Sequence, residues 1–434
     1  MTGDLDSRPP RPFLPPLLVA GLVLWAATAL IWPTLRLAPT AAFPVLGMLA
    51  LGAAVWLASH ALRAARGDGF SLGALAALSL AAAVALCSFW GGALRGSMAY
   101  AEAQGGDSAP VTWHAELTED ARRGDFGWHA EARLRGADGR VLRVRLNLPE
   151  DAALLQGQSM TASGTLKPPA EAVAAYYWDT GLAGSLTASE SAFVSEEAAL
   201  DSGPFVHLRR CALDLIAACG GDNAPLLQAL VCGWRPAIEE SGLYDCFKAV
   251  GLAHLVAVSG AHLSIVVLFV AGGLKLLRLG RKATTVASAL FLVGYVAFTG
   301  MPVSALRAAV MAATGLFALW ANRRNSALSA LGLCLLLFVG ADPACALSAS
   351  FALSAGSTLG IVLFAPLLSS AFAGLPRLKK VVGDPLALTG SSALATQPYA
   401  AALFSQLPLL SPLANLVAGP LFSLACLVGF VAVL

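Results

Sequence analysis

The stretch that decides the fold is residues 127–149, GWHAEARLRGADGRVLRVRLNLP. Apolar and polar side chains alternate along it with a period of two, broken by Gly136-Ala137-Asp138-Gly139. The apolar set is Trp128, Ala130, Ala132 and Leu134, continued after the break by Val144, Leu146 and Leu148. Alternation on both sides of a glycine-containing turn predicts a β-hairpin. Residues 156–166, QGQSMTASGTL, predict another short strand pair, so we expect a small β-barrel or sandwich.

Apolar runs long enough to cross a membrane flank this β region on both sides. The whole chain is 57% hydrophobic and 12% charged, and a soluble domain usually carries about twice that charged fraction. The runs cover about 13–32, 41–62 and 70–94 before the hairpin, and 251–277, 283–300, 302–321, 326–341, 344–371, 385–405 and 408–434 after it. The sequence therefore predicts a polytopic α-helical membrane protein with an inserted small β-barrel of the OB-like type.

The distribution of charge predicts the orientation. Arg8 and Arg11 precede the first run, and Arg63 and Arg66 follow the second, so the positive-inside rule places the N-terminus in the cytoplasm. Three crossings then put residues 97–200 outside, as an extracytoplasmic domain with fifteen acidic and eight basic residues. Basic clusters recur after every second later run, at Arg278/Arg281/Lys282, Arg323/Arg324 and Arg377/Lys379/Lys380. These clusters agree with the same orientation.

Residues 201–250 have a different character from the runs on either side. FVHLRRCALDLIAAC has helical spacing with Arg209 and Arg210, and we expect it to lie along the membrane surface as an amphipathic helix. The next segment predicts short helices broken at Gly233 and Pro236. The chain stops inside the apolar run CLVGFVAVL, so we expect a C-terminal truncation.

Ionisable side chains inside the later runs are candidates for a functional path, because charge is costly at the centre of a bilayer. Arg307 lies among small residues that let helices approach closely. His254 and His262 are eight residues apart, so on one helix both would face one cavity, and Gly260 lets a backbone or ligand come near. Gln397 and Asn415 lie in a proline-rich region, where broken helices can line a cavity. The structural alternatives are an arginine that snorkels to the interface, histidines bonded to carbonyls, and simple helix kinks.

Two other classes of protein stay open at this point. AVSG, residues 257–260, is similar to the GxSG loop of intramembrane serine proteases, with Ser259 as the nucleophile, although its first glycine is missing. A small-solute secondary transporter usually shows an internal repeat, and this sequence shows none. The eight cysteines have no CxxC or Cys/His ligand spacing, so neither a metal site nor a cofactor is predicted.

A series of segments in order resembles the ComEC/Rec2-type competence proteins, which take up DNA during natural transformation. The segments are LLQGQSMTASGTLKPP with YYWDTGLAGSL, LVCGWRPAIEESGLYDCFKAVGLAHLVAVSGAHLSIVVL, TGMPVSALRAAVMA, DPACALSASFALSAGSTLGIVL and QPYAAALFSQLPLLSPLANLVAGPL. The chain departs from the family pattern at Ala261, where leucine is usual, and at Ala352, where glutamine is usual. The HxHxDH pattern of the family's metallo-β-lactamase-like domain is missing, so no nuclease or other enzyme activity is expected here.

The resemblance implies a membrane channel for single-stranded DNA. It divides the chain into three N-terminal spans (1–96), an OB-like domain (97–200), interfacial helices (201–250) and a channel domain (251–434). The expected lining residues are Arg235, Lys248, His254, Ser259, Gly260, His262, Arg307, Gln397 and Asn415, because Lys and Arg dominate contacts to phosphates. In the β domain, Arg133, Arg135, Arg140, Arg143 and Arg145 are possible DNA contacts, although a scaffold role is slightly favoured. Implied partners are other competence proteins, membrane lipids and a second copy of the chain, in the bacterial cytoplasmic membrane.

Overall fold

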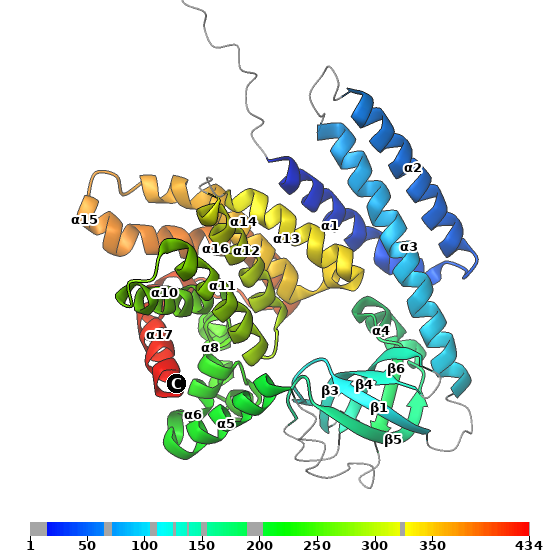
Figure 1. The fold of residues 1–434 in the computed structure, drawn as a ribbon, viewed down its shortest axis with the longest axis horizontal. Helices are drawn as coiled ribbons and strands as arrows, with labels where there is room; N and C mark the ends of the chain where they lie inside the picture. The colour runs from blue at the N-terminus through cyan, green and yellow to red at the C-terminus, as the bar shows by residue number, and fades with distance from the viewer. Residues whose placement is uncertain are drawn as a thin grey trace, which may run out of the picture.

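The structure is a computed structural model that describes residues 15–64, 72–104, 111–124, 127–136, 139–148, 154–188, 203–321 and 326–433. It consists of a helical bundle with a β-barrel at one end (Figure 1). The fold class predicted from the sequence, a polytopic helical protein with a small inserted barrel, is confirmed. The positions Arg8, Arg11, Arg66, Arg323 and Arg324, together with the centre of the predicted hairpin turn, lie outside the described residues.

The β region is a closed five-stranded barrel with a short sixth strand at its edge. Its strands are β1 (Val111–Leu117), β2 (Arg122–Gly124), β3 (Gly127–Arg135), β4 (Val141–Leu148), β5 (Ser159–Lys167) and β6 (Gly184–Ala188). The order β1-β5-β6-β4-β3 is closed by pairing of β1 with β3, and β2 continues from β3. All these pairings are antiparallel except β4 with β6. Closure leaves few strand edges unpaired, which protects a small barrel from edge-to-edge association.

The period-two pattern sorts the side chains as the sequence predicts. Ala130, Ala132 and Leu134 are buried, and they join Val144 and Leu146 of the paired strand in one apolar core. Trp128 is only partly buried and packs against the edge of that core. The prediction of a strand pair at residues 156–166 is wrong, because the chain there forms the single strand β5, which pairs with β1 and β6.

Three N-terminal helices pack together, and the end of the third reaches the barrel (Figure 1). They are α1 (Pro16–Thr34), α2 (Ala42–Ala64) and α3 (Leu72–Gln104), with a short turn η1 (Leu35–Leu37) after α1. With 33 residues, α3 is about 50 Å long, which exceeds the roughly 30 Å hydrocarbon core and lets it continue to the barrel. Helix α1 packs tightly on α13 (Ala327–Ala341) through Gly21 and Gly332, and a Cβ at Gly332 would overlap the carbonyl oxygen of Leu17.

The segment after the barrel is a series of short helices, as the sequence predicts. It contains α5 (Pro204–Cys219), η5 (Gly221–Asn223), α6 (Ala224–Leu227), the π-helical turn η6 (Gln228–Cys232), α7 (Pro236–Glu240) and α8 (Leu243–Val250). Gly233 ends η6 with φ 71°, a conformation that favours glycine. Pro236 begins α7 at a position where its missing N–H costs nothing. Arg209 of α5 is buried, whereas its neighbour Arg210 is half-buried.

The remaining elements form the main helical bundle. They are α9 (Ala253–Val256), α10 (Gly260–Leu276), α11 (Arg281–Phe298), α12 (Val303–Trp320), α13, η7 (Pro343–Leu347), α14 (Ala349–Ser370), α15 (Pro376–Leu378), the π-helical turn η8 (Lys379–Gly383), α16 (Asp384–Phe404) and α17 (Ser411–Val433). The sequence places one continuous run over 251–277, but the backbone there breaks and the long helix begins only at Gly260. The 3-10 turn η7 likewise precedes α14 within the predicted run 344–371.

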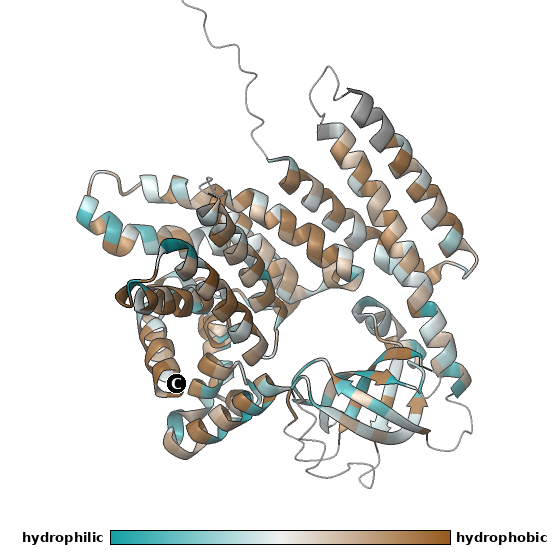
Figure 2. Ribbon diagram, viewed as in Figure 1, coloured by the Kyte–Doolittle hydropathy of each residue, from teal (hydrophilic) through white to brown (hydrophobic). Residues whose placement is uncertain are grey.

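The apolar surface of the bundle fits a membrane protein. Four helical segments of the described chain are long and apolar enough to cross a membrane: Pro16–Leu37, Gly73–Gln104, Ala349–Ser370 and Ser411–Val433. Shorter apolar helices, including α10, α12 and α13, stand among them. Figure 2 shows apolar residues covering the bundle and a more polar barrel. Large apolar side chains are exposed along α17 at helical spacing, namely Leu413, Val417, Leu421, Leu424 and Val428.

Candidate functional site

The break before α10 is held by a capping box. The Ser259 backbone N–H donates to the His262 Nδ1 atom at 3.1 Å, while the Ser259 hydroxyl accepts from the His262 backbone N–H. The hydroxyl oxygen also lies 2.9 Å from Nδ1. In the usual capping box, glutamate or glutamine at this third helical position reaches back to the cap residue. His262 takes that part here, and its side chain is buried.

The two histidines therefore do not share a helix. His254 lies on the short helix α9 and is exposed, whereas His262 lies in the first turn of α10 and is buried. The sequence prediction that one continuous helix turns both rings into a single cavity is wrong. Gly260 does allow a close approach, because a Cβ built there would lie 3.4 Å from the Ala308 Cβ of α12.

A polar junction joins the turn before α9 to the connection between α16 and α17. Gly251 has φ 78°, and a Cβ there would meet Pro408 at 2.8 Å. The Gly251 carbonyl oxygen accepts from the Ser411 hydroxyl at 3.2 Å. The Gln397 Nε2 atom donates to the Pro408 carbonyl at 3.2 Å. His254 Nδ1 lies 3.2 Å from the Gly251 carbonyl, and its ring also interacts with the Asn415 side chain. Three residues predicted as path-lining, His254, Gln397 and Asn415, are thus brought together here.

Arg307 is a buried cation for which the described residues provide no counter-charge. Its side chain is 6% exposed, and its Nε and Nη1 atoms have no hydrogen-bond partner in the described part of the chain. Its backbone carbonyl accepts from the Cys334 thiol at 3.6 Å, which places this turn of α12 against α13. One turn earlier, the Ser304 hydroxyl donates to the Val258 carbonyl at 2.9 Å, which ties α12 to the break before α10.

The last two predicted path residues lie in the segment before the break. Arg235 is half-buried at the start of α7. Lys248 is exposed on α8, where its Nζ atom lies 5.9 Å from the centre of the Tyr244 ring. The Lys248 backbone carbonyl accepts from the Gly251 N–H of the polar junction at 3.0 Å. Among the described residues, neither side chain makes a hydrogen bond or ion pair with the junction or with Arg307.

The arginines of the barrel hairpin are largely engaged with other groups. Arg143 donates to Asp342 at 2.8 Å and to Glu131 at 3.4 Å. Arg133 lies 3.8 Å from Glu116, and the Arg140 guanidinium stands 4.6 Å from the centre of the Tyr100 ring on α3. Arg135 is exposed, and Arg145 is half-buried in a pocket. Most of the set thus has partners within the protein, and both the scaffold role and the DNA contact stay predictions.

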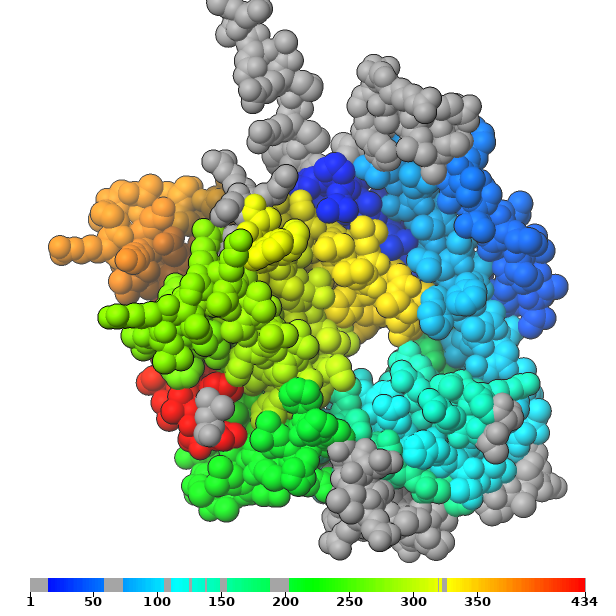
Figure 3. Space-filling model, viewed as in Figure 1, coloured from blue at the N-terminus to red at the C-terminus, as the bar shows by residue number. Residues whose placement is uncertain are grey.

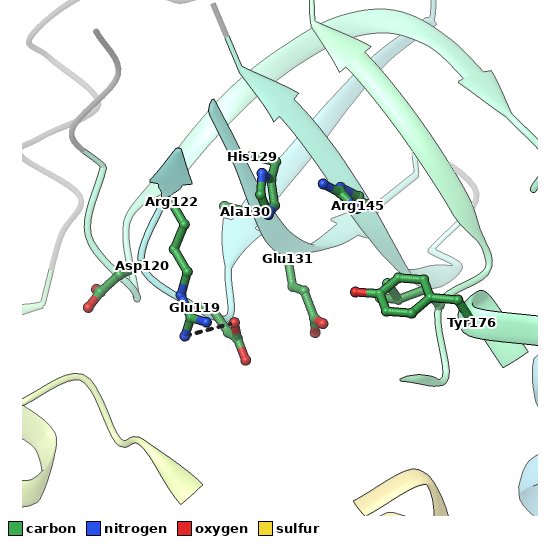
Figure 4. A pocket seen from close by; sticks show the side chains of 9 residues that line it. Glu119, Asp120, Arg122, His129, Ala130, Glu131, Arg145 and Tyr176 are labelled. Carbon is green, nitrogen blue, oxygen red and sulfur yellow. Dashed lines mark ion pairs between the residues drawn. The ribbon is translucent and has the colours of Figure 1, made fainter. Parts of the chain in front are cut away.

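That pocket lies on the outer surface of the barrel and mixes both signs of charge. Figure 4 shows Glu119, Arg122 and Glu131 pointing away from the barrel toward segments of the helical bundle, with Tyr176 at one side. Arg122 and Glu119 form an ion pair at 3.5 Å. Burial raises the pKa of the Glu131 carboxyl, and the nearby Glu119 carboxylate raises it further. In the described residues no group of three or more His, Cys, Asp or Glu side chains is placed to hold a metal ion.

Comparison with known proteins relates the C-terminal part of the chain to a family. Residues 230–434 match the family model described as Competence protein. The chain carries a competence-protein domain of the ComEC/Rec2 type. ComE operon protein 3 from Bacillus subtilis (strain 168) is 30% identical over 218 residues, which are 49% of this chain and 26% of that protein. The aligned part thus spans about a quarter of that relative. No solved structure matches the chain.

The competence domain is fixed to the barrel by an ion pair that the sequence did not reveal. Arg209 of α5 is almost fully buried and donates two hydrogen bonds of 2.7 Å to the carboxylate of Asp120 in the barrel. Its Nε atom donates to the Cys232 carbonyl of the competence domain at 2.9 Å. Gly300, at the turn between α11 and α12, lies so close that a Cβ there would stand 2.6 Å from an Arg209 nitrogen. The guanidinium therefore links the barrel, α5, η6 and the base of α12.

Further contacts also attach the barrel to the helices. Arg143 reaches Asp342 at the end of α13. Trp178, on helix α4 (Ala174–Thr180), exchanges hydrogen bonds with Trp32 of α1, each indole N–H donating to the other's carbonyl at 2.8 and 3.1 Å. Figure 3 shows an open gap between the barrel and the bundle. The barrel is therefore held at separate points rather than by one continuous interface.

Proposed function

We propose that this chain forms a membrane channel for the uptake of single-stranded DNA during natural transformation. Membership of residues 230–434 in the competence family supports a role in DNA uptake. The proposed setting is the bacterial cytoplasmic membrane, with the N-terminus in the cytoplasm and the barrel outside. The proposed partners are single-stranded DNA, other competence proteins, membrane lipids and a second copy of the chain.

The observation that carries the proposal is the uncompensated charge of Arg307. A buried ion without a partner costs several kcal/mol, so a fold retains one where the charge is used. DNA carries a negative charge on each phosphate, and basic side chains dominate its binding. Arg307 lies in α12, within the competence domain and beside the break that precedes α10. We infer that its guanidinium meets the phosphates of the passing strand.

The polar junction supports the same path. Interrupted helices at membrane depth are tolerated where they line a cavity or are buried in protein. The breaks at Gly251 and Ser259 and the connection after α16 gather His254, Gln397 and Asn415. These groups donate and accept hydrogen bonds without reading base identity, as sequence-blind passage requires. Arg235 and Lys248 remain proposed lining residues in the segment before the break.

The test is transformation by cells that carry single substitutions. Arg307→Gln removes the charge and keeps hydrogen-bond donors, so we expect it to abolish uptake of labelled DNA, whereas Arg307→Lys should retain part of it. Arg377→Gln, at an exposed arginine before η8, is the matched control and should transform normally. The amount of membrane-inserted protein is measured for each variant. Normal transformation by inserted Arg307→Gln would refute the role of this residue.

A hydrolase is the second candidate function, because the Ser259 hydroxyl lies 2.9 Å from the His262 Nδ1 atom. A nucleophile and its base stand at this distance, but so do the members of the capping box. Ser259→Asn separates the two functions, since asparagine caps a helix as well as serine and cannot attack a substrate. We expect Ser259→Asn to transform normally. Loss of uptake with unchanged stability would favour the hydrolase.

A further inference from the structure

Arg307 raises a question that is independent of what passes through the bundle. Its guanidinium is buried in the structure, so its charge needs compensation in the resting protein as well. The described residues place no carboxylate in an ion pair with it. Arg209 is also buried, but its guanidinium is paired with a carboxylate. Asp120 accepts two hydrogen bonds from it.

The surroundings of Arg307 offer thiols and apolar groups instead of an anion. The Cys334 and Cys345 thiols lie within electrostatic range of its guanidinium. The Cys334 thiol is already engaged with the Arg307 backbone carbonyl. The neighbouring turns of α12 carry Val303, Leu306, Ala308 and Met311, which pack into apolar clusters. Two buried N–H groups, on Nε and Nη1, are left without acceptors from the described protein.

We propose that Arg307 binds a small monovalent inorganic anion, chloride in the cell, when no substrate is present. An anion beside the guanidinium removes the cost of an unpaired buried charge and accepts from the free N–H groups. A monatomic anion suits a site lined by apolar side chains and thiols, because it needs no directional partners of its own. Arrival of a phosphate would then be an exchange of one anion for another at the same cation.

The experiment measures chloride binding by the purified full-length chain in nanodiscs of zwitterionic lipid, without DNA. We expect saturable binding of about one radioactive chloride per chain, and a Tm that rises by about 2 °C when chloride replaces gluconate. Arg307→Met should lose both effects and Arg307→Lys should retain them. Arg377→Gln, an exposed arginine, should bind chloride as the wild type does.

Three outcomes would overturn the inference. The first is no saturable chloride binding by the wild type, and the second is equal binding by Arg307→Met. The third is a Tm that rises with inorganic phosphate and does not rise with chloride. The wild-type measurement decides even if Arg307→Met fails to fold. Because no DNA is present, failure here leaves the transformation defect of Arg307→Gln to be judged separately.

Discussion

Arg209 and Asp120 form a bidentate ion pair across the junction of barrel and bundle, with both nitrogen–oxygen distances at 2.7 Å. The side chains are 2% and 16% exposed, so water does little to screen either charge. The pair closes a contact between elements 89 residues apart in the sequence. Its burial and its position at the base of α12 make it one of the contacts that fix the barrel against the bundle.

Removal of one partner should destabilise the protein strongly. Asp120→Ala leaves a buried guanidinium unpaired, and we expect a loss of about 3–5 kcal/mol. The Tm of the purified chain and the rate of proteolytic cleavage in the barrel measure the effect. The control is Arg143→Gln, which breaks two partly exposed ion pairs, to Asp342 and to Glu131, and should cost about 2 kcal/mol or less in total. Equal effects of the two substitutions would contradict the assignment.

Contact between α1 and α13 should be sensitive to a single methyl group. In Gly332→Ala the new Cβ overlaps the Leu17 carbonyl, and the two helices must move apart at a cost of about 1–3 kcal/mol. Gly340→Ala, on the same helix with open space at the Cβ position, should be neutral or slightly stabilising. Thermal unfolding of both variants in detergent gives the comparison. A similar Tm for the two would show that the helices do not pack as described.

His262 should be replaceable by glutamine but not by alanine. His262→Gln keeps a side chain that can reach the Ser259 backbone N–H, so the capping box survives. His262→Ala leaves that donor buried and should cost about 0.5–2 kcal/mol, with a lower Tm. Transformation frequency measured beside the Tm separates capping from direct contact with DNA. A loss of uptake in His262→Gln at unchanged Tm would assign the ring a role in the path.

The Glu131 carboxyl should give the barrel a pH-dependent stability. Burial raises its pKa above 4.5, so its contribution is fully present below pH 4.5 and is lost as the pH rises through the raised pKa. In Glu131→Gln this loss disappears, and the Tm of the variant relative to wild type should increase between about pH 4 and pH 7. Glu102→Gln, at an exposed position on α3, should parallel the wild type across that range.

Local sequence patterns predicted most helices and strands. They did not predict which distant strands pair with each other. Alternation over 127–149 predicted β3 and β4, because one face of each strand is buried. Neither the parallel pairing of β4 with β6 nor the closure of β1 on β3 leaves a local signal. The prediction of two strands within residues 156–166 was wrong, because one strand of a closed barrel has the same composition as two short paired strands.

The candidate site was predicted only in part. Arg307 stood out because a cation within an apolar run is costly wherever its partner lies. Ser259 and His262 were assigned to a helix interior, since the usual capping signature carries Glu or Gln at the third position and this chain carries histidine. Asp120 could not be singled out among the fifteen acidic residues of its domain, because its partner is distant in sequence.

The seam between α1 and α13 also sets an order of assembly during synthesis. Gly332 leaves the ribosome about 310 residues after Gly21. At about 5–20 residues per second, α1 spends about 15–60 s in the bilayer before its neighbour exists. For that period the face of α1 around Gly21 is open to lipid or to the insertion machinery. The barrel emerges before α13 and closes on itself. It can therefore finish folding before α13 covers that face of α1.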